Sequence, residues 1–89
     1  MADPKDTPLT RRFQTWRALN PGVSFSVMAA LVNDAGGSVS PQGVWQWSSG
    51  HKRPVRRNRA ALAVIFGDCT EADLLLMSRG YEPRRETSS

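Results

Sequence analysis

The sequence predicts an all-α domain of five short helices, and two observations support this fold class. Ser or Thr caps precede apolar runs with helical spacing four times, and prolines or glycines open or end most of these runs. No stretch alternates cleanly between apolar and polar residues over five or more positions, as a half-buried strand would. The 89 residues suffice for one domain, which we expect over residues 7–80, between polar ends (1–6 and 81–89) that we expect to be flexible.

Three helices are expected in the first half of the chain. Thr7, followed by a proline, caps the first, which runs to residue 19 before an Asn-Pro-Gly stop. Ser24 caps the second, which a glycine pair ends, and Ser40 caps the third, which Gly50 closes. Helical spacing predicts that these core-facing residues point inward: Leu9, Phe13, Trp16, Leu19, Met28, Leu31, Val32, Ala35, Val44 and Trp47.

Two more helices are expected after a basic stretch. The fourth is predicted to open at about Asn58 and to end before Gly67. Thr70 caps the fifth, with Asp73 three residues later in the manner of a capping box. The apolar positions of this last helix are Leu74, Leu75 and Met77, and Gly80 ends it.

Several functional classes are disfavoured. The sequence suggests no carboxylate partner for the single histidine, His51, and contains no P-loop or calcium-loop pattern, so we expect neither an enzyme nor a cofactor. Asp68, Glu71 and Asp73 sit at helix caps, where negative charge suits the helix dipole. Cys69 beside a helix start is open to a lowered pKa, but a small buried thiol is the preferred interpretation.

The chain is expected to be cytoplasmic. It has no run of ~18 apolar residues, as a membrane span needs. Its N-terminus has acids and prolines where a signal peptide needs a basic start and an apolar stretch. One cysteine excludes an intrachain disulfide and a multi-cysteine zinc site.

Charge is the strongest compositional signal. The formal net charge is +4 and the isoelectric point is near 10.2, which is typical of nucleic-acid binders. Residues 51–59 hold five cations and no acid, and a second basic group is formed by Arg11, Arg12 and Arg17. A solvated loop, an acidic protein partner or a membrane surface would also suit this stretch, although its prolines argue against an amphipathic membrane helix.

Residues 39–54, VSPQGVWQWSSGHKRP, resemble the helix-turn-helix of the Cro and phage-repressor type, the Xre family. The family pattern is roughly V-S-x-x-x-V-x-x-W-x-x-G-x-x-x-P. The similarity extends over about residues 9–80 and implies a compact five-helix lambda-repressor-like domain whose third helix enters the DNA major groove. The fixed positions are met here by Val39, Ser40, Val44, Trp47, Gly50 and Pro54.

Two departures from the family pattern stand out. The compact turn between the second and third helices is expanded over residues 34–38, which is similar to a mycobacterial secretion regulator of the same superfamily. Phe25 stands where family members often have a glutamine, which puts a family phosphate contact in doubt.

The third helix has a polar face opposite its apolar one. Gln42, Trp45, Gln46 and Ser49 share that face, and the two glutamines suit paired hydrogen bonds to adenine, or are simply solvated. Trp45 has two equal interpretations: contact with a thymine methyl or a sugar, or burial over a neighbouring helix. Ser49 can reach a base or a phosphate, and Gly43 would let the backbone come close to the groove wall.

The resemblance also implies a set of phosphate contacts. Lys52, Arg53, Arg56 and Arg57 follow the third helix, where family members bind phosphates. The helix starts at Ser24 and Ser40 add backbone N–H groups. Arg17 and Arg59 are further candidates or are solvated or paired internally.

These residues together predict a sequence-specific regulator of transcription that binds duplex DNA, a small phage- or prophage-type repressor acting by operator occupancy. We expect a homodimer on two half-sites, with Leu76 or Met77 as candidate dimer contacts unless one is only an isolated exposed apolar residue. The alternatives are a DNA-binding antitoxin, a nucleoid-type architectural protein or a protein-interaction adaptor on the same fold. No membrane or small-molecule partner is expected.

Overall fold

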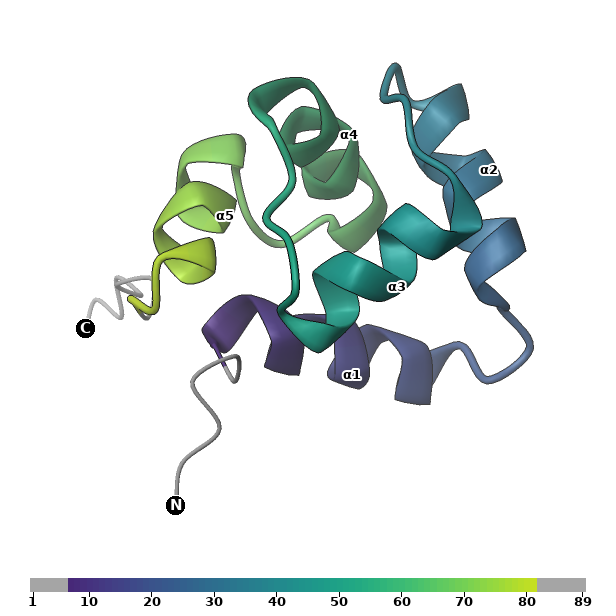
Figure 1. The fold of residues 1–89 in the computed structure, drawn as a ribbon, viewed down its shortest axis with the longest axis horizontal. Helices are drawn as coiled ribbons and strands as arrows, with labels where there is room; N and C mark the ends of the chain where they lie inside the picture. The colour runs from purple at the N-terminus through teal and green to yellow at the C-terminus, as the bar shows by residue number, and fades with distance from the viewer. Residues whose placement is uncertain (1–6, 82–89) are drawn as a thin grey trace.

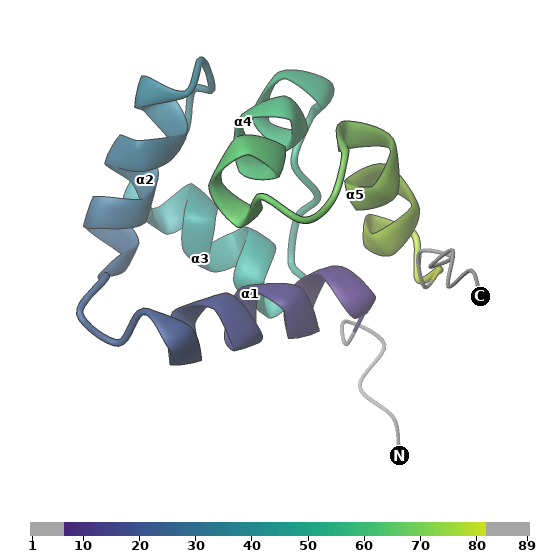
Figure 2. The ribbon, with the colours of Figure 1, turned by 180° about the vertical axis from the view of Figure 1, so that it is seen from behind.

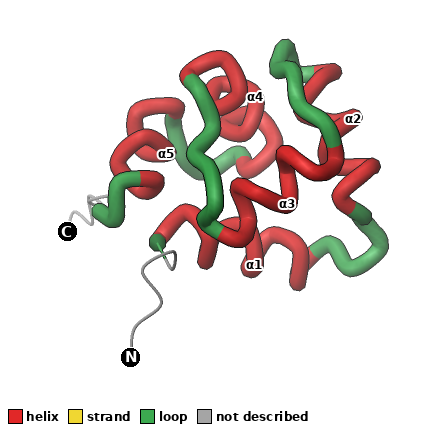
Figure 3. Tube along the Cα trace, viewed as in Figure 1, coloured by secondary structure: helices red, strands yellow, loops and turns green. Residues whose placement is uncertain are grey.

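A computed structural model describes residues 7–81, which form five α-helices joined by loops. The predicted all-α class is therefore confirmed: Figure 3 shows helices joined by loops, with no strand among the described residues. Of the predicted flexible ends, 1–6 and 81–89, all but Tyr81 lie outside the described residues. The helices are α1 (Pro8–Leu19), α2 (Phe25–Asp34), α3 (Pro41–Ser49), α4 (Arg56–Phe66) and α5 (Glu71–Ser78).

The helices form a closed ring of contacts around one core. α1 packs on α3, α3 on α2, α2 on α4, α4 on α5, and α5 returns to α1. α3 lies on the face turned to the viewer in Figure 1, and α4 lies on the face seen from behind in Figure 2. This arrangement leaves one long side of α3 without a covering helix. No described helix is long and apolar enough to cross a membrane.

Phe13 of α1 lies at the centre of the core and is fully buried. Its ring meets Phe66 edge-on, with centroids 5.4 Å apart, and meets Trp47 at 6.4 Å in a tilted arrangement. Trp16 is half-buried and packs against Phe66, with ring centroids 6.3 Å apart. Every helix contributes to the cluster of buried apolar side chains: Leu9, Phe13, Met28, Ala29, Val32, Val44, Trp47, Ala61, Leu62, Phe66, Leu74 and Met77.

Two of the predicted core positions are wrong. Leu19 is 73% exposed because it is the last residue of α1. Leu31 is 38% exposed because the buried side of α2 is centred on Met28, Ala29 and Val32, one helical step away.

The predicted caps are confirmed at all four positions. The hydroxyls of Thr7, Ser24, Ser40 and Thr70 each accept a hydrogen bond from the backbone N–H three residues later. At Thr70 the Asp73 carboxylate accepts the amide of the cap in return, which completes the predicted capping box.

The predicted start of the fourth helix is wrong. α4 begins at Arg56, behind Val55, which has no side chain that can cap the helix. Asn58 lies inside α4, and its buried amide is bonded to the turn before α3. Asn58 was predicted to open the helix by bonding a near neighbour in the sequence, but its partner, Ser38, is twenty residues away.

Candidate nucleic-acid interface

α3 has one buried side and one open side. Val44 is fully buried and Trp47 nearly so, as predicted, and they anchor the helix to the core. On the opposite side Gln42 and Trp45 are exposed and Gln46 is half-buried. Gly50 ends the helix in the left-handed conformation at φ 83°, as its predicted role as a stop requires.

The turn between α2 and α3, residues 35–40, is held by side chains of two helices. Asn33 of α2 bonds both backbone groups of Val39, at 3.1 and 2.8 Å. Asn58 of α4 does the same for Ser38: its Oδ1 accepts the amide at 2.7 Å and its Nδ2 donates to the carbonyl at 3.2 Å. These four hydrogen bonds fix the turn, and through it the start of α3.

Glycines at two positions are needed for packing around this turn. A Cβ on Gly37 would lie 2.5 Å from Val32 Cγ1 and 2.7 Å from Asn58 Oδ1. A Cβ on Gly43, in the first turn of α3, would lie 2.5 Å from Val39 Cγ2. The absence of a side chain at Gly43, which was predicted to serve close approach to DNA, therefore already has a packing reason inside the protein.

Of the two predicted roles of Trp45, burial over a neighbouring helix is wrong, and contact with DNA stays a prediction. Trp45 does not fold over a neighbouring helix; it remains 42% exposed and stacks on the ring of His51, with centroids 5.0 Å apart and planes 23° apart. Ser49 Oγ lies 2.7 Å from His51 Nδ1 and also donates to the Trp45 carbonyl at 2.9 Å. Ser49, predicted to reach a base or phosphate, thus uses its hydroxyl within the protein.

His51 is a side chain of the candidate interface to which the sequence analysis assigned no contact, because it was weighed as a catalytic candidate and otherwise only as part of the basic stretch 51–59. The signal was local: a serine and a histidine two residues apart, with Gly50 between them turning the chain back. A left-handed glycine at this place brings the two side chains together.

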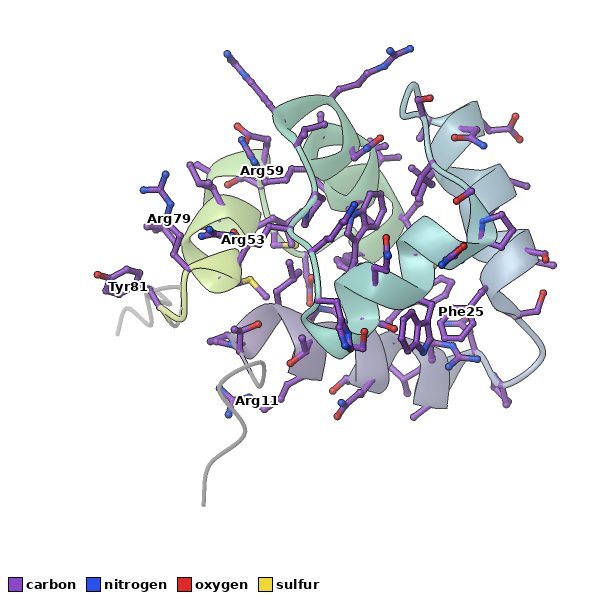
Figure 4. The ribbon with its side chains drawn as sticks, in the orientation of Figure 1. Arg11, Phe25, Arg53, Arg59, Arg79 and Tyr81 are labelled. Carbon is purple, nitrogen blue, oxygen red and sulfur yellow. The ribbon has the colours of Figure 1, made fainter. Side chains whose placement is uncertain are left out.

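The cations after α3 divide into two kinds. The side chains of Lys52, Arg53 and Arg56 are exposed and have no hydrogen-bond or ion-pair partner within residues 7–81. Figure 4 shows Arg53 extending from the loop after α3 toward α5. Arg57 is exposed, but its Nε donates to the Gly36 carbonyl at 2.9 Å, so it also holds the turn before α3.

The remaining candidate cations take part in the fold. Arg59 pairs with Glu71 of α5 and donates to the Pro54 carbonyl, which makes it an internal group and not a phosphate contact. Arg17 lies over the ring of Phe25 at 4.2 Å from its centroid. Figure 4 shows Phe25 at the α2 start, opposite the end of the molecule where Arg53 and Tyr81 lie.

Arg12 joins α1 to the turn between α4 and α5. Its guanidinium donates to Asp68 Oδ1 at 2.8 Å and lies over Phe66 at 4.7 Å from the ring centroid. The hydrogen bond from Arg12 lowers the pKa of Asp68, although its carboxylate is half-exposed.

Two helix starts face solvent as predicted. Ser24 and Ser40 are exposed, and each hydroxyl already accepts one amide of its own helix. The first two residues of a helix have no intrahelical acceptor for their amides. Because α3 begins with Pro41, its first position has no N–H, so α2 offers more free donors to an anion than α3 does.

The two candidate dimer contacts differ. Met77 lies in the core at 4% exposure, which corrects its proposed role at an interface. Leu76 is 44% exposed at the end of α5, next to the exposed Tyr81. A helix of eight residues turns Leu74 and Met77 inward, so Leu76 is left outside.

Cys69 does not have the properties of an activated thiol. It is half-buried against the core, and this burial, reinforced by the charge of Asp68, raises its pKa to about 11. Among the described residues there is no cluster of three metal-ligating side chains.

Comparison of the chain with protein-family models, with curated proteins and with solved structures finds no match.

Proposed function

We propose that this chain is a sequence-specific regulator of transcription that binds duplex DNA with α3 in the major groove, on a lambda-repressor-like helix-turn-helix fold. One observation carries the proposal: α3 is anchored by Val44 and Trp47 while its outer side presents amides and an indole to solvent. No described helix covers this side. Its amides and indole suit the base edges in the major groove, which present hydrogen-bond donors, acceptors and methyl groups.

The outer side of α3 offers two chemistries for reading bases. Gln42 and Gln46 lie four residues apart, one turn along the helix, and each carboxamide can pair with N6 and N7 of an adenine. The exposed edge of Trp45 offers an apolar contact for a thymine methyl.

The phosphate contacts follow from the cations that the fold leaves unpaired. Lys52, Arg53 and Arg56 lie in the segment directly after α3, and their charge is not neutralised within residues 7–81. Cations placed beside a reading helix fix its register on the duplex without selecting sequence. The α2 start, beside the Arg17 guanidinium, supplies a second point on the backbone.

One such domain reads only a few base pairs, so we propose a homodimer on two half-sites, with Leu76 at the contact between copies. Regulation would act by operator occupancy in the cytoplasm, on the nucleoid.

Selection from a pool of random duplexes, with bound DNA sequenced and affinity measured against salt, tests the proposal. The expected result is an enriched motif with two-fold symmetry and a log–log salt slope of about −0.9 per neutralised phosphate. Salt-sensitive binding without a motif would replace it with an architectural, nucleoid-type role. Absence of binding at low salt would refute DNA binding and favour an acidic protein partner.

A further inference from the structure

His51 lies at the junction between the open side of α3 and the basic loop that follows it. Its ring is exposed on one side and stacks on Trp45 on the other, and Nδ1 lies 2.7 Å from the Ser49 hydroxyl. The second ring nitrogen, Nε2, has no hydrogen-bond partner within residues 7–81. A side chain held by two contacts, with one polar atom left to solvent, is prepared to bind something outside the protein.

We propose that His51 is a further DNA contact, in which the protonated imidazole donates Nε2–H to a backbone phosphate and makes the affinity for DNA depend on pH. The inference rests on the proposed function above and adds to it a residue and a mode of regulation that the α3 face and the loop arginines do not provide.

Ser49 allows the imidazole to remain in place when it takes up a proton. The Ser49 hydroxyl has an alternative acceptor, the Trp45 carbonyl at 2.9 Å. With its proton on that carbonyl, the hydroxyl oxygen accepts Nδ1–H from His51, which is the one arrangement that an imidazolium permits. In the protonated ring the outward Nε2 therefore carries an N–H as well, as a charged donor.

Trp45 holds the same ring by stacking on its face. An imidazolium stacked on an indole gains a cation–π attraction, and the centroid distance of 5.0 Å is within the range for such contacts. Stacking also fixes the plane of the ring. Nε2 is thus directed by two independent contacts, one in the ring plane and one on the ring face.

The surroundings of His51 are basic. Its own loop carries Lys52 and Arg53, α4 begins with Arg56 and Arg57, and α3 contributes the uncharged Trp45 and Ser49. Of the four acids within residues 7–81, Asp68 and Glu71 are paired with arginines, the carboxylate of Asp73 accepts the Thr70 amide, and Asp34 is the exposed last residue of α2. No described carboxylate forms a bond with His51, so a phosphate is the anion that would complete the site.

The sign of the effect follows from proton linkage. The protonated form binds phosphate better, so DNA binding takes up a proton and the affinity falls as pH rises. One site takes up at most one proton per domain. An exposed charge pair of this kind changes affinity by about three- to fivefold.

The test is the affinity of wild type, His51→Gln and Lys52→Gln for two duplexes at pH 8.0 and pH 5.5, at constant salt. One duplex carries the selected motif and the other a scrambled version. Wild type is expected to bind both duplexes about three- to fivefold more tightly at pH 5.5, and His51→Gln to lose this gain. Lys52→Gln is the matched control: it removes a neighbouring cation, so it should weaken binding at both pH values and keep the gain. Circular dichroism verifies that the variants fold.

An equal gain in wild type and His51→Gln would overturn the inference while DNA binding itself stands. A gain confined to the selected duplex would also overturn it, because a phosphate contact is independent of sequence. Failure of wild type to bind either duplex would refute the proposed function and this inference with it.

Discussion

The segments that precede and follow α3 in the sequence are both polar, but they differ in whether their polar groups are bonded to the rest of the protein. Before α3, the backbone of residues 35–40 is bonded to Asn33, Arg57 and Asn58, which belong to α2 and α4. After α3, Lys52, Arg53 and the first residue of α4, Arg56, have side chains without a partner within residues 7–81. Hydrogen bonds therefore fix the turn before α3, whereas the cations after α3 have no partner within residues 7–81 and can bind an anion.

Residues that are adjacent in the sequence therefore have two different roles, one in holding the turn before α3 and one in presenting charge. Arg56 and Arg57 are neighbours, yet only Arg57 reaches back to the turn before α3. Substitutions before α3 should therefore lower stability, whereas substitutions on its open side or after it should change DNA binding at nearly constant stability.

Asn58→Ala should have the largest effect. It removes a buried amide that satisfies both backbone groups of Ser38, and the free energy of unfolding should fall by about 3 kcal/mol. Urea denaturation measures this. Asn33→Ala is the matched control, because it removes an equivalent pair of bonds from an exposed side chain and should lower stability less. Equal losses for the two variants would contradict the assigned role of burial at Asn58.

Gly37→Ala should lower stability by about 2 kcal/mol, because its Cβ would meet Val32 and the Asn58 carboxamide at distances that require them to move. Gly22→Ala is the control, since a Cβ there meets nothing within 4 Å. Thermal unfolding of the two variants compares them directly. A stable Gly37→Ala would show that the turn before α3 is less constrained than its bonds indicate.

Gln46→Ala, on the open side of α3, should relax sequence preference. The loss of a carboxamide that pairs with adenine should reduce discrimination between the selected and substituted duplexes by about 1–2 kcal/mol, with the fold intact. Competition binding on a panel of single-base variants measures it. An equal loss of affinity on every duplex would remove Gln46 from the reading role.

Arg56→Ala should weaken binding to all duplexes alike, by less than ~1 kcal/mol near physiological salt, and reduce the salt slope by about 1. Arg79→Ala carries the same change of charge at the end of α5 and serves as the control. If both variants changed the salt slope equally, net charge and not position would explain the effect.

The smallest effect concerns the Arg12–Asp68 pair. Because the Arg12 hydrogen bond lowers the pKa of Asp68, the pair stabilises the fold above the ordinary carboxyl value of 3.8. That contribution should disappear as pH falls through the lowered value, and half-exposure of the carboxylate keeps it to a few tenths of a kcal/mol. Stability measured against pH for wild type and Asp68→Asn should converge at low pH; a constant difference would contradict the pairing.

The sequence predicted features that depend on near neighbours. Caps at Thr7, Ser24, Ser40 and Thr70 act over three residues, so their patterns were sufficient. The start of α4 was mispredicted because Asn58 bonds a turn that is remote in the sequence. Four consecutive apolar residues, 74–77, likewise left open whether Leu76 or Met77 faces outward, and the packing shows that Leu76 does.

The sequence predicted which residues lie on the open side of α3, but not which of the nearby cations are paired with acids. Gln42, Trp45 and Gln46 follow from helical spacing once α3 is placed. Which arginines remain unpaired depends on where the acids of other helices lie, as Arg59 and Glu71 illustrate. His51 belongs to the candidate site because it stacks on Trp45 and bonds Ser49, and both contacts require the left-handed turn at Gly50.

The most direct test of the central claim uses the three tryptophans as reporters. In a titration of isotopically labelled protein with the selected duplex, the indole N–H of Trp45 should shift strongly in the NMR spectrum. The indoles of Trp16 and Trp47 lie on the core side and should shift little. An unshifted Trp45 indole in the DNA-bound protein would show that α3 does not face the DNA and would contradict the account.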